Sequence, residues 1–275
     1  MTAHLSGEAL SVWEDVAAFW DENYTRDGNQ YFKVLQAPAI ERFIAEKVSG
    51  GAHVKALDLA TGNGVVARLI ARHPGTTVLA TDGADNMLRI AQGHVEDGMN
   101  MRFRKVDVTS DHDLAALIAD EGEKTFDIVT ISMAIMDIAT LDPLVRALPK
   151  LLAKDGIFVA TVLHPVFFTN NATRKIEIDF DPEGNTRVVR SKVIKEYLHV
   201  PPFRGWAIPG QPRMQLYFHR PMCELFSTFF KGGLVMDAME EPAFTEADAR
   251  EDRREASVNY TQLPAILAWR MRLAA

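Results

Sequence analysis

The chain has 275 residues, of which 47% are hydrophobic and 24% are charged, and its formal net charge is −7. This composition excludes a disordered protein and fits an enzyme with one large domain, or a core domain with a sizeable insertion. The acidic balance disfavours a nucleic-acid partner. With Cys223 as the single cysteine, we expect no disulfide, no metal and a reducing cytoplasmic location, and we expect neither secretion nor contact with a membrane.

Residues 8–50 are rich in aromatic side chains and favour helices, with a break at Gly28-Asn29. Large apolar side chains in such a layer usually pack in a core. The other interpretation is that the layer is a lid over a ligand. Both interpretations apply to the aromatic residues near the break, Tyr24, Tyr31 and Phe32.

An apolar strand over residues 55–59 leads into a glycine turn with the spacing Gly62-x-Gly64-x-x-Ala67. Such a turn allows a tight reversal and a close approach of the backbone to a ligand. Residues 65–73 can continue as a helix whose N-terminus faces the same crevice. The turn therefore predicts a nucleotide site.

Three further strands follow at intervals of about one βα unit. Residues 77–82 end on Asp82, which can accept both hydroxyls of a ribose, and residues 101–108 include Asp107, which can accept an adenine amino proton. Residues 125–133 have the pattern of a buried strand that would lie beside the first one. The order predicts a doubly wound α/β sheet with its ligand at the carboxyl ends of the strands.

Asp58 helps to decide which nucleotide binds, because the same turn serves NAD, FAD and S-adenosylmethionine. A carboxylate just before the turn would repel the two phosphates of a dinucleotide. It suits the ammonium and sulfonium groups of S-adenosylmethionine, directly or through a water. An NAD-dependent dehydrogenase remains the alternative, and Asp58 and Asp107 both argue against it.

At these residues the chain resembles the class I S-adenosylmethionine-dependent methyltransferases. Their first motif, an acidic residue followed by x-Gly-x-Gly-x-Gly, is present here as Asp58-x-Ala60-x-Gly62-x-Gly64, with alanine in place of the first glycine. Their next two acidic residues match Asp82 and Asp107, and their post-motif helix, turn and strand match residues 148–161. The resemblance implies a Rossmann-like seven-stranded mixed sheet, S-adenosylmethionine as cofactor, and methyl transfer.

The resemblance also implies where the cofactor binds, at the strand ends and under the N-terminal helices. The expected contacts are Tyr24, Tyr31, Phe32, Asp58, Ala60, Gly62, Asn63, Gly64, Asp82, Gly83, Met87, Asp107, Val108, Ser132 and Met133.

After a fifth strand at residues 157–163 the simple alternation of strands and helices ends. Residues 174–180 and 187–194 alternate with period two around turn residues 181–185, which predicts a β-hairpin. A helix over 222–231 and strands over 234–239 and 265–273 complete the chain. We therefore expect a helical lid at 1–50, a Rossmann-like core at 51–164 and 221–275, and a substrate cap at 165–220, inserted after strand five.

Within the family, the chain resembles the ubiquinone-biosynthesis-like and natural-product enzymes. The matching segments are 163–165, 217–221, 240–242 and 263–267. This resemblance implies a small-molecule acceptor and leaves open whether O, N, S or C is methylated. We expect a monomer or a homodimer. A protein that binds the cofactor without transferring methyl is a further alternative.

Methyl transfer needs in-line alignment, and it needs a base only if the acceptor atom must lose a proton. His164 and His219, at the two mouths of the cap, are the candidate catalytic residues, although each also suits a structural hydrogen bond. The candidate acceptor contacts are Met136, Asp137, Tyr197, Trp206, Tyr217 and Arg220. Each has a structural alternative: the methionine and the aromatic residues also suit core packing, Asp137 also suits capping of the next turn, and Arg220 also suits an ion pair with Glu240 or Glu241.

Overall fold

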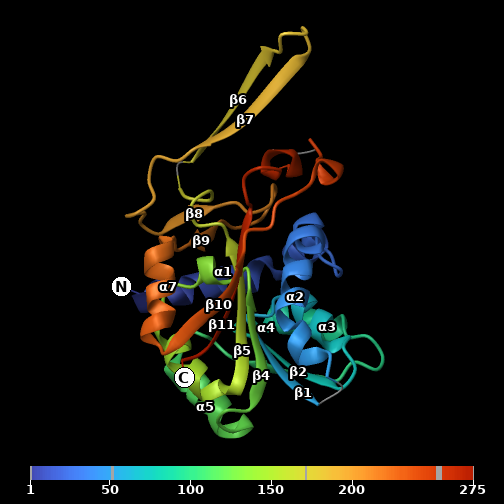
Figure 1. Cartoon of the computed structure of the whole chain (residues 1–275). Coiled ribbons are helices and arrows are strands. Elements are labelled where there is room, and N and C mark those ends of the chain that lie inside the picture. The colour runs from blue at the N-terminus through green and yellow to red at the C-terminus, as the bar shows by residue number, and fades with distance from the viewer. Residues whose placement is uncertain (1, 51–52, 171, 252–255, 275) are drawn as a thin grey trace.

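A seven-stranded sheet forms the centre of the structure, a computed structural model that describes residues 2–50, 53–170, 172–251 and 256–274 (Figure 1). The strand order is β10-β11-β5-β4-β1-β2-β3, and neighbours are parallel except in the two pairs that include β11. The order reverses between β1 and β4, so the expected doubly wound, Rossmann-like mixed sheet is confirmed. The strands are β1 (Val54–Leu59), β2 (Thr76–Asp82), β3 (Met101–Lys105), β4 (Phe126–Ser132), β5 (Leu152–Leu163), β10 (Leu234–Glu240) and β11 (Ile266–Leu273).

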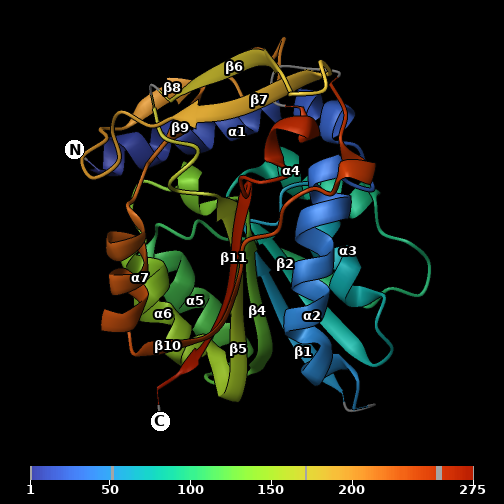
Figure 2. The same ribbon diagram turned by 45° about the horizontal axis from the view of Figure 1, so that its top comes forward.

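Helices cover both faces of this sheet, which explains why the middle strands are apolar along their whole length. Figure 2 shows α2 and α3 on one face and α5, α6 and α7 on the other. Strand β5 serves both cores, because Phe158 and Ala160 belong to the cluster on the α6 and α7 side while Ile157 and Val159 belong to the other. The helices are α2 (Ala37–Val48), α3 (Val65–Ala71), α5 (Asp111–Glu121), α6 (Asp142–Leu151) and α7 (Met222–Lys231).

A long first helix, α1 (Thr2–Tyr24), lies across the carboxyl edge of the sheet, beside α4 (Asp85–Gly93) (Figure 2). Asn86 at the start of α4 donates from Nδ2 to the carbonyl of Glu14, at 2.8 Å. After α1 the chain turns through Gly28 (φ +79°), where a Cβ atom would lie 2.4 Å from the ring of Phe32, so only glycine fits. A π-helical segment, η1 (Phe32–Gln36), then leads into α2.

The chain between β5 and α7 lies above the same edge of the sheet. It holds the hairpin β6 (Thr173–Phe180) and β7 (Thr186–Val193), which projects away from the body, and the short pair β8 (Phe203–Gly205) and β9 (Gln215–Tyr217) (Figure 1). The remaining short elements are η2 (Ile135–Asp137), η3 (Glu246–Asp248) and η4 (Ser257–Tyr260). Arg204 of β8 pairs with Glu8 of α1 at 2.6 Å, and Arg213 pairs with Asp15, so this segment is tied to α1.

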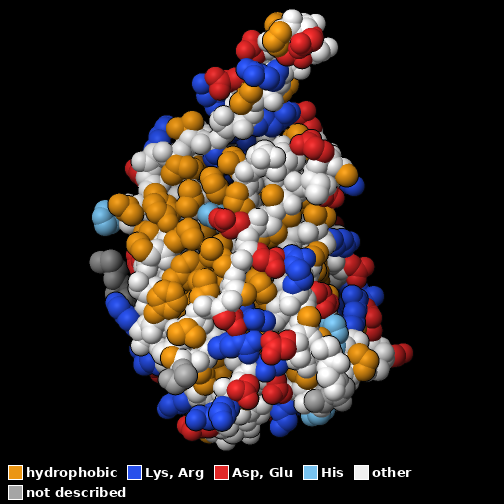
Figure 3. All heavy atoms as spheres, viewed as in Figure 1, with side chains coloured by type: hydrophobic (Ala, Val, Ile, Leu, Met, Phe, Trp, Pro, Cys, Tyr) orange, Lys and Arg blue, Asp and Glu red, His pale blue; other side chains and the backbone are white. Residues whose placement is uncertain are grey.

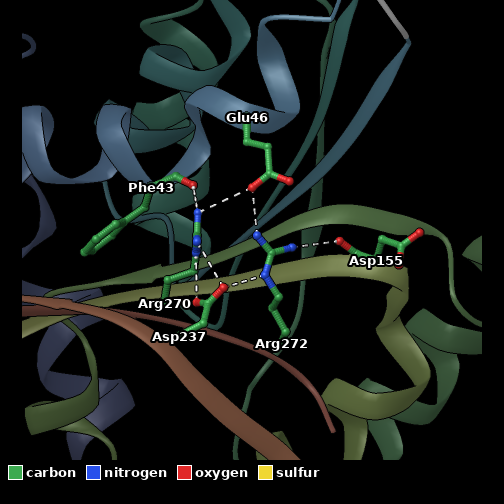
Figure 4. Close-up of polar contacts among 6 residues, drawn as sticks. All are labelled: Phe43, Glu46, Asp155, Asp237, Arg270 and Arg272. Carbon is green, nitrogen blue, oxygen red and sulfur yellow. Dashed lines mark hydrogen bonds and ion pairs between the residues drawn. The ribbon is translucent and has the colours of Figure 1, made fainter. Parts of the chain in front are cut away.

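An ion-pair network joins the edge strand β10 and its neighbour β11 to helix α2 (Figure 4). Arg270 of β11 donates from Nε to Oδ1 of Asp237 on β10 at 2.9 Å, and Arg272 donates from Nε to Oδ2 of the same carboxylate. Arg272 also reaches Glu46 of α2 at 2.9 Å, and Arg270 donates to the carbonyl of Phe43 at 3.0 Å. Asp237 is thus the shared acceptor that aligns both arginines.

We expect Asp237→Asn to lower the free energy of unfolding by about 1–2 kcal/mol at neutral pH, because two largely buried guanidinium groups lose a charged acceptor. Burial acts to raise the pKa of Asp237, but the hydrogen bonds from Arg270 and Arg272 outweigh it and hold the pKa below its usual range. The stabilisation is therefore present above the unfolded pKa and is lost as pH falls through the lower folded pKa.

Urea unfolding of both proteins across the acid range measures this difference. Asp111→Asn is the matched control, because Asp111 pairs with Arg146 and both side chains are more than half exposed, so its loss should cost less than about 0.5 kcal/mol. Equal effects of the two substitutions would contradict the role of the network.

Candidate cofactor and acceptor cleft

A cleft runs along the carboxyl ends of β1 to β4 and is roofed by α1. Its volume is about 1060 Å³, including the part open to solvent. Twelve of the fifteen residues expected to contact the cofactor line it: Tyr24, Asp58, Ala60, Gly62, Asn63, Asp82, Gly83, Met87, Asp107, Val108, Ser132 and Met133. The structure thus brings together residues from the N-terminal helix and from four strand ends.

The glycine turn after β1 presents bare backbone to the cleft. A Cβ atom on Gly62 (φ +57°) would meet nothing within 4 Å, so this position opens onto free space. Gly64 (φ +80°) serves packing instead, since a Cβ there would lie 3.1 Å from the side chains of Ala91 and Arg68. Ala60, where the resembled motif has its first glycine, has φ +50°, a conformation that costs an L-residue about 1–2 kcal/mol. The surrounding structure holds Ala60 in this left-handed conformation.

The buried carboxylate of Asp58 braces this turn. Thr61 of the turn donates to Oδ2 at 2.5 Å, and Thr130 of β4 donates to Oδ1 at 2.6 Å. Burial raises the pKa of Asp58 to about 6, and the charge of Asp82 acts in the same direction. Asp58 therefore fixes the turn to the neighbouring strand while remaining on the wall of the cleft.

Two more carboxylates follow at the next strand ends. Asp82 accepts the backbone N–H of Gly62 at Oδ2 and that of Ala84 at Oδ1, both at 2.9 Å, and burial raises its pKa to about 6. Asp107 accepts both the backbone N–H and the hydroxyl of Thr109 at Oδ1, each at 2.8 Å. The wall of the cleft is therefore acidic at three successive strand ends.

Helix α1 supplies an aromatic roof that the sequence analysis did not single out as cofactor contacts. Trp13 meets Trp20 edge-on with ring centroids 5.0 Å apart, and Trp20 stacks on Tyr24 at 5.6 Å. The intervals of seven and four residues place these rings on one helix face, which was the available signal. In the sequence they were indistinguishable from core aromatics. Other lining residues that the sequence did not indicate include Ser6, Ala9, Leu10, Gln36, Thr109 and Ala139.

The three remaining residues of the expected cofactor set do not line the cleft. Gly64 lies beneath the turn. Tyr31 packs edge-on against Phe244 at 5.0 Å, and Phe32 is buried below Gly28, beside Tyr24. Tyr31 and Phe32 thus pack within the protein instead of lining the cleft.

His164 lies outside the cleft, and both of its ring nitrogens are engaged. Nδ1 accepts the backbone N–H of Val166 at 3.2 Å, so Nε2 carries the proton and donates to Glu241, at 2.7 Å. Burial lowers the pKa of His164 despite the neighbouring carboxylate. This ring joins the end of β5 to the segment after β10.

His219 lines a second, smaller hollow, together with Met136, Tyr217 and Arg220. This hollow borders the loop after β4 and is separate from the main cleft. The Nε2 of His219 donates to the carbonyl of Tyr197 at 2.6 Å, and burial lowers the pKa of His219. Neither candidate histidine lines the main cleft.

Arg220 is also engaged within the protein. It donates to the carbonyls of Ile135 (3.1 Å), Phe218 (3.3 Å) and Ile138 (2.7 Å), which fastens the loop after β4. Two other candidate acceptor contacts, Tyr197 and Trp206, line neither space. The Tyr197 hydroxyl accepts the N–H of Met222 at 2.8 Å, and Trp206 is 52% exposed.

Asp137 is the candidate acceptor residue that the structure places in the main cleft. It is 6% exposed, and its Oδ1 accepts a hydrogen bond from Nε2 of Gln215 at 3.2 Å. Gln215 accepts in turn from Gln211, at 3.2 Å. Burial raises the pKa of Asp137 well above its usual range, and the Gln215 hydrogen bond opposes that only partly.

Comparisons with known proteins agree with this architecture. Residues 56–156 match a family model described as a methyltransferase domain. Solved S-adenosylmethionine-dependent methyltransferases from Mesorhizobium loti and Clostridium acetobutylicum share the fold. The first has 21% identity and a TM-score of 0.60 over 85% of this chain and 97% of that chain. The second has 14% identity and a TM-score of 0.56 over 95% and 98%.

The CcbJ methyltransferase from Streptomyces caelestis is also similar, with 16% identity, a TM-score of 0.56, and coverage of 96% of this chain and 98% of that chain. No curated protein shows a significant match. Residues 56–156 are therefore similar to a methyltransferase domain, and the chain has the fold of the class I S-adenosylmethionine-dependent methyltransferases.

Among the residues that the structure describes, no helix has the length and apolar character needed to cross a membrane. No group of three or more histidine, cysteine or acidic side chains among the same residues is placed to hold a metal ion.

We expect Asp82→Asn to weaken cofactor binding by on the order of 2–4 kcal/mol, because charge-assisted hydrogen bonds are lost. We also expect wild-type affinity to fall as pH drops through about 6, where Asp58 and Asp82 take up protons and no longer attract a cationic ligand. Isothermal titration with S-adenosylmethionine between about pH 5 and pH 8 measures both effects.

Asp85→Asn is the control for this titration, since Asp85 is exposed and pairs with Lys105 at the surface. It should leave the affinity and its pH dependence unchanged. An affinity independent of pH in the wild-type protein would contradict the role given to the two buried carboxylates.

We expect His164→Leu to lower the free energy of unfolding by about 1–3 kcal/mol, because the N–H of Val166 and the carboxylate of Glu241 lose their partner. Cofactor affinity should stay within about twofold, since the ring does not face the cleft. Thermal unfolding and cofactor titration measure the two quantities. A folded variant of unchanged stability that has lost turnover would show instead that His164 is catalytic.

Proposed function

We propose that this protein transfers the methyl group of S-adenosylmethionine to a small, largely apolar acceptor that donates a hydrogen bond to Asp137. The observation that carries the proposal is the composition of the one cleft. Its wall has the glycine turn and strand-end carboxylates on one side, and Asp137 among apolar residues on the other. Two ligands bound in these two parts would share the same enclosed space.

The chemistry of the lining fits the cofactor. Gly62 exposes its backbone to open space, and Asp58, Asp82 and Asp107 supply acidic acceptors for a cationic nucleoside with free ribose hydroxyls. The same carboxylates disfavour the phosphates of a dinucleotide. The flat rings of Trp13, Trp20 and Tyr24 close the space from above.

The acceptor part is small and mostly apolar. It is bounded by Ala9 of α1 and by residues of the loop after β4, including Ala134, Ile138 and Ala139. Asp137 is the ionisable side chain in this part of the lining. A buried carboxylate of this kind prefers a ligand that brings its own N–H or O–H, because an unmet charge in an apolar wall is costly.

When bound, S-adenosylmethionine supplies an electrophilic methyl carbon on a sulfonium, which leaves as a neutral thioether. The protein aligns the acceptor atom with that carbon and excludes water. Asp137 holds the acceptor's N–H or O–H and takes its proton as the acceptor's lone pair bonds to carbon. The raised pKa makes Asp137 a stronger base than an ordinary carboxylate, provided that it is ionised.

The general test is production of S-adenosylhomocysteine by the purified protein with a panel of small phenols, amines and carboxylic acids. Turnover with at least one class supports the proposal. A protein that binds the cofactor but gives no product with any class would contradict it.

With a productive acceptor, we expect Asp137→Asn to lower kcat by about 10²–10⁴-fold while leaving cofactor affinity unchanged, because the amide cannot accept the proton. Wild-type kcat should rise with pH through the raised pKa of Asp137, and this rise should disappear in the variant. Steady-state kinetics against pH measures both.

Asp142→Asn is the matched control. Asp142 lies five residues further on, at the exposed start of α6, and does not line the cleft. Wild-type turnover in Asp137→Asn, or an equal loss in Asp142→Asn, would contradict the assignment.

A further inference from the structure

The side chain of Arg68, on α3, is buried beneath the glycine turn. It is 2% exposed and is one of the largest fully buried side chains of the protein. Arginine is almost never buried to this extent unless it is paired. Among the described residues, however, the guanidinium donates to two backbone carbonyls rather than to an acid. Nη1 donates to the carbonyl of Asn63 at 2.7 Å, and Nη2 donates to the carbonyl of Arg26.

This guanidinium remains charged at neutral pH. Burial lowers the pKa of Arg68 to about 10, and the charges of Arg26 and Arg72 act in the same direction. The acids Asp27 and Glu96 oppose this shift only partly. A buried charge is tolerated only where its hydrogen bonds are satisfied, so Arg68 depends on the two carbonyls, and they are held in place by it.

The two carbonyls belong to two different parts of the cleft. Asn63 lies in the turn after β1 and lines the cleft. Arg26 follows helix α1, whose last residue, Tyr24, lines the same cleft. Gly64 leaves room for the guanidinium, since a Cβ atom there would lie 3.1 Å from Nη1 of Arg68. Arg68 therefore joins the wall of the cleft to the chain that follows its roof.

The side chain of Asn63 makes a second set of bonds across the same contact. Its Nδ2 donates to Oδ1 of Asp21 at 2.9 Å and to the carbonyl of Thr25 at 3.1 Å. Asn63 is thus held at its carbonyl by Arg68 and at its amide by the end of α1. Neither Arg68 nor Asp21 lines the cleft, so each can affect a bound ligand only through the residues that it holds.

The backbone of the turn requires such support. Ala60, Gly62 and Gly64 have left-handed φ values of +50°, +57° and +80°. Conformations of this kind persist where the surrounding structure fixes them. The buried carboxylates described above hold the first part of the turn, and Arg68 holds the second part at the carbonyl of Asn63.

We propose that Arg68 is a positioning residue for the cofactor. Its guanidinium holds the Asn63 peptide and the chain after α1 in the arrangement that binds S-adenosylmethionine most tightly. Because the ligand is S-adenosylmethionine, this role rests on the proposed function. Cofactor affinity then depends on a buried cation that does not touch the cofactor.

Isothermal titration of the full chain with S-adenosylmethionine at neutral pH tests this role. Arg68→Met keeps an apolar stem and removes every donor, so both carbonyls lose their partner, and the dissociation constant should rise at least about tenfold. Arg68→Lys keeps the charge but replaces the planar fork with a single ammonium group. It should retain part of the affinity, with a rise of about two- to fivefold.

Arg270→Met is the matched control, because a purely structural role would lower stability without changing the affinity of the folded protein. Arg270 is also largely buried and donates to a backbone carbonyl, that of Phe43, at 3.0 Å, but it does not line the cleft. Its network lies by α2 and β10, where Figure 3 shows acidic and basic side chains side by side. This variant should unfold at a lower temperature and keep its affinity within about twofold.

Asp21→Ala tests the same contact from its other side. The dissociation constant should rise about threefold or more, because the amide of Asn63 loses a charged acceptor. In a protein that carries both Asp21→Ala and Arg68→Met, the rise should be smaller than the product of the two single effects, because both residues hold Asn63.

Circular dichroism and thermal unfolding establish that each variant is folded at the temperature of the titration. Unchanged affinity in folded Arg68→Met would overturn the proposal, as would an equal loss in Arg270→Met or independent effects in the double variant. If Arg68→Met does not fold, unchanged affinity in both Arg68→Lys and Asp21→Ala overturns it. A wild-type protein that does not bind S-adenosylmethionine would instead contradict the proposed function itself.

Discussion

The candidate site depends on two buried carboxylates that hold the turn between β1 and α3. Asp58 accepts hydroxyls from Thr61 and Thr130, and Asp82 accepts the N–H of Gly62. Together they bind the turn to β4 on one side and to β2 on the other. Both are kept in an environment that disfavours their charge, which raises the pKa of each to about 6. A cation placed between them relieves that cost, so the interactions that fix the turn also prepare it for a positively charged ligand.

The other side of the cleft is held by different means. The loop after β4 carries Asp137, and its carbonyls at Ile135 and Ile138 are bound by Arg220 from the chain before α7. Burial lowers the pKa of Arg220 to about 10, so it stays charged at neutral pH. A buried cation with several carbonyl partners positions the loop without entering the cleft. The Asp137 side of the cleft thus owes its shape to the chain before α7, and its polarity to Asp137 and Gln215.

The fold could be predicted from the sequence because its signals are local. Each strand that ends at or near Asp58, Asp82 or Asp107 is marked by its own apolar run, and parallel strands bring their carboxyl ends together. The partners of the histidines were beyond such reasoning, because Glu241 is 77 residues from His164 and no periodicity links them. The position of the α1 aromatic residues over the cleft could not be predicted for another reason. Trp13 and Trp20 have the spacing of any buried helix face, and only the position of α1 over the strand ends distinguishes a ligand cover from a core.

Helix α1 and the segment that holds β8 and β9 are joined by the ion pairs of Arg204 with Glu8 and of Arg213 with Asp15. Helix α1 also contacts the turn, where Asn63 donates to Asp21 at 2.9 Å. The chain after α1 passes through two residues with left-handed backbone conformation, Thr25 (φ +71°) and Gly28 (φ +79°), before it continues into η1 and α2. Because one helix is bonded both to the glycine turn and to the segment above the Asp137 side, a displacement of α1 would change both parts of the cleft together.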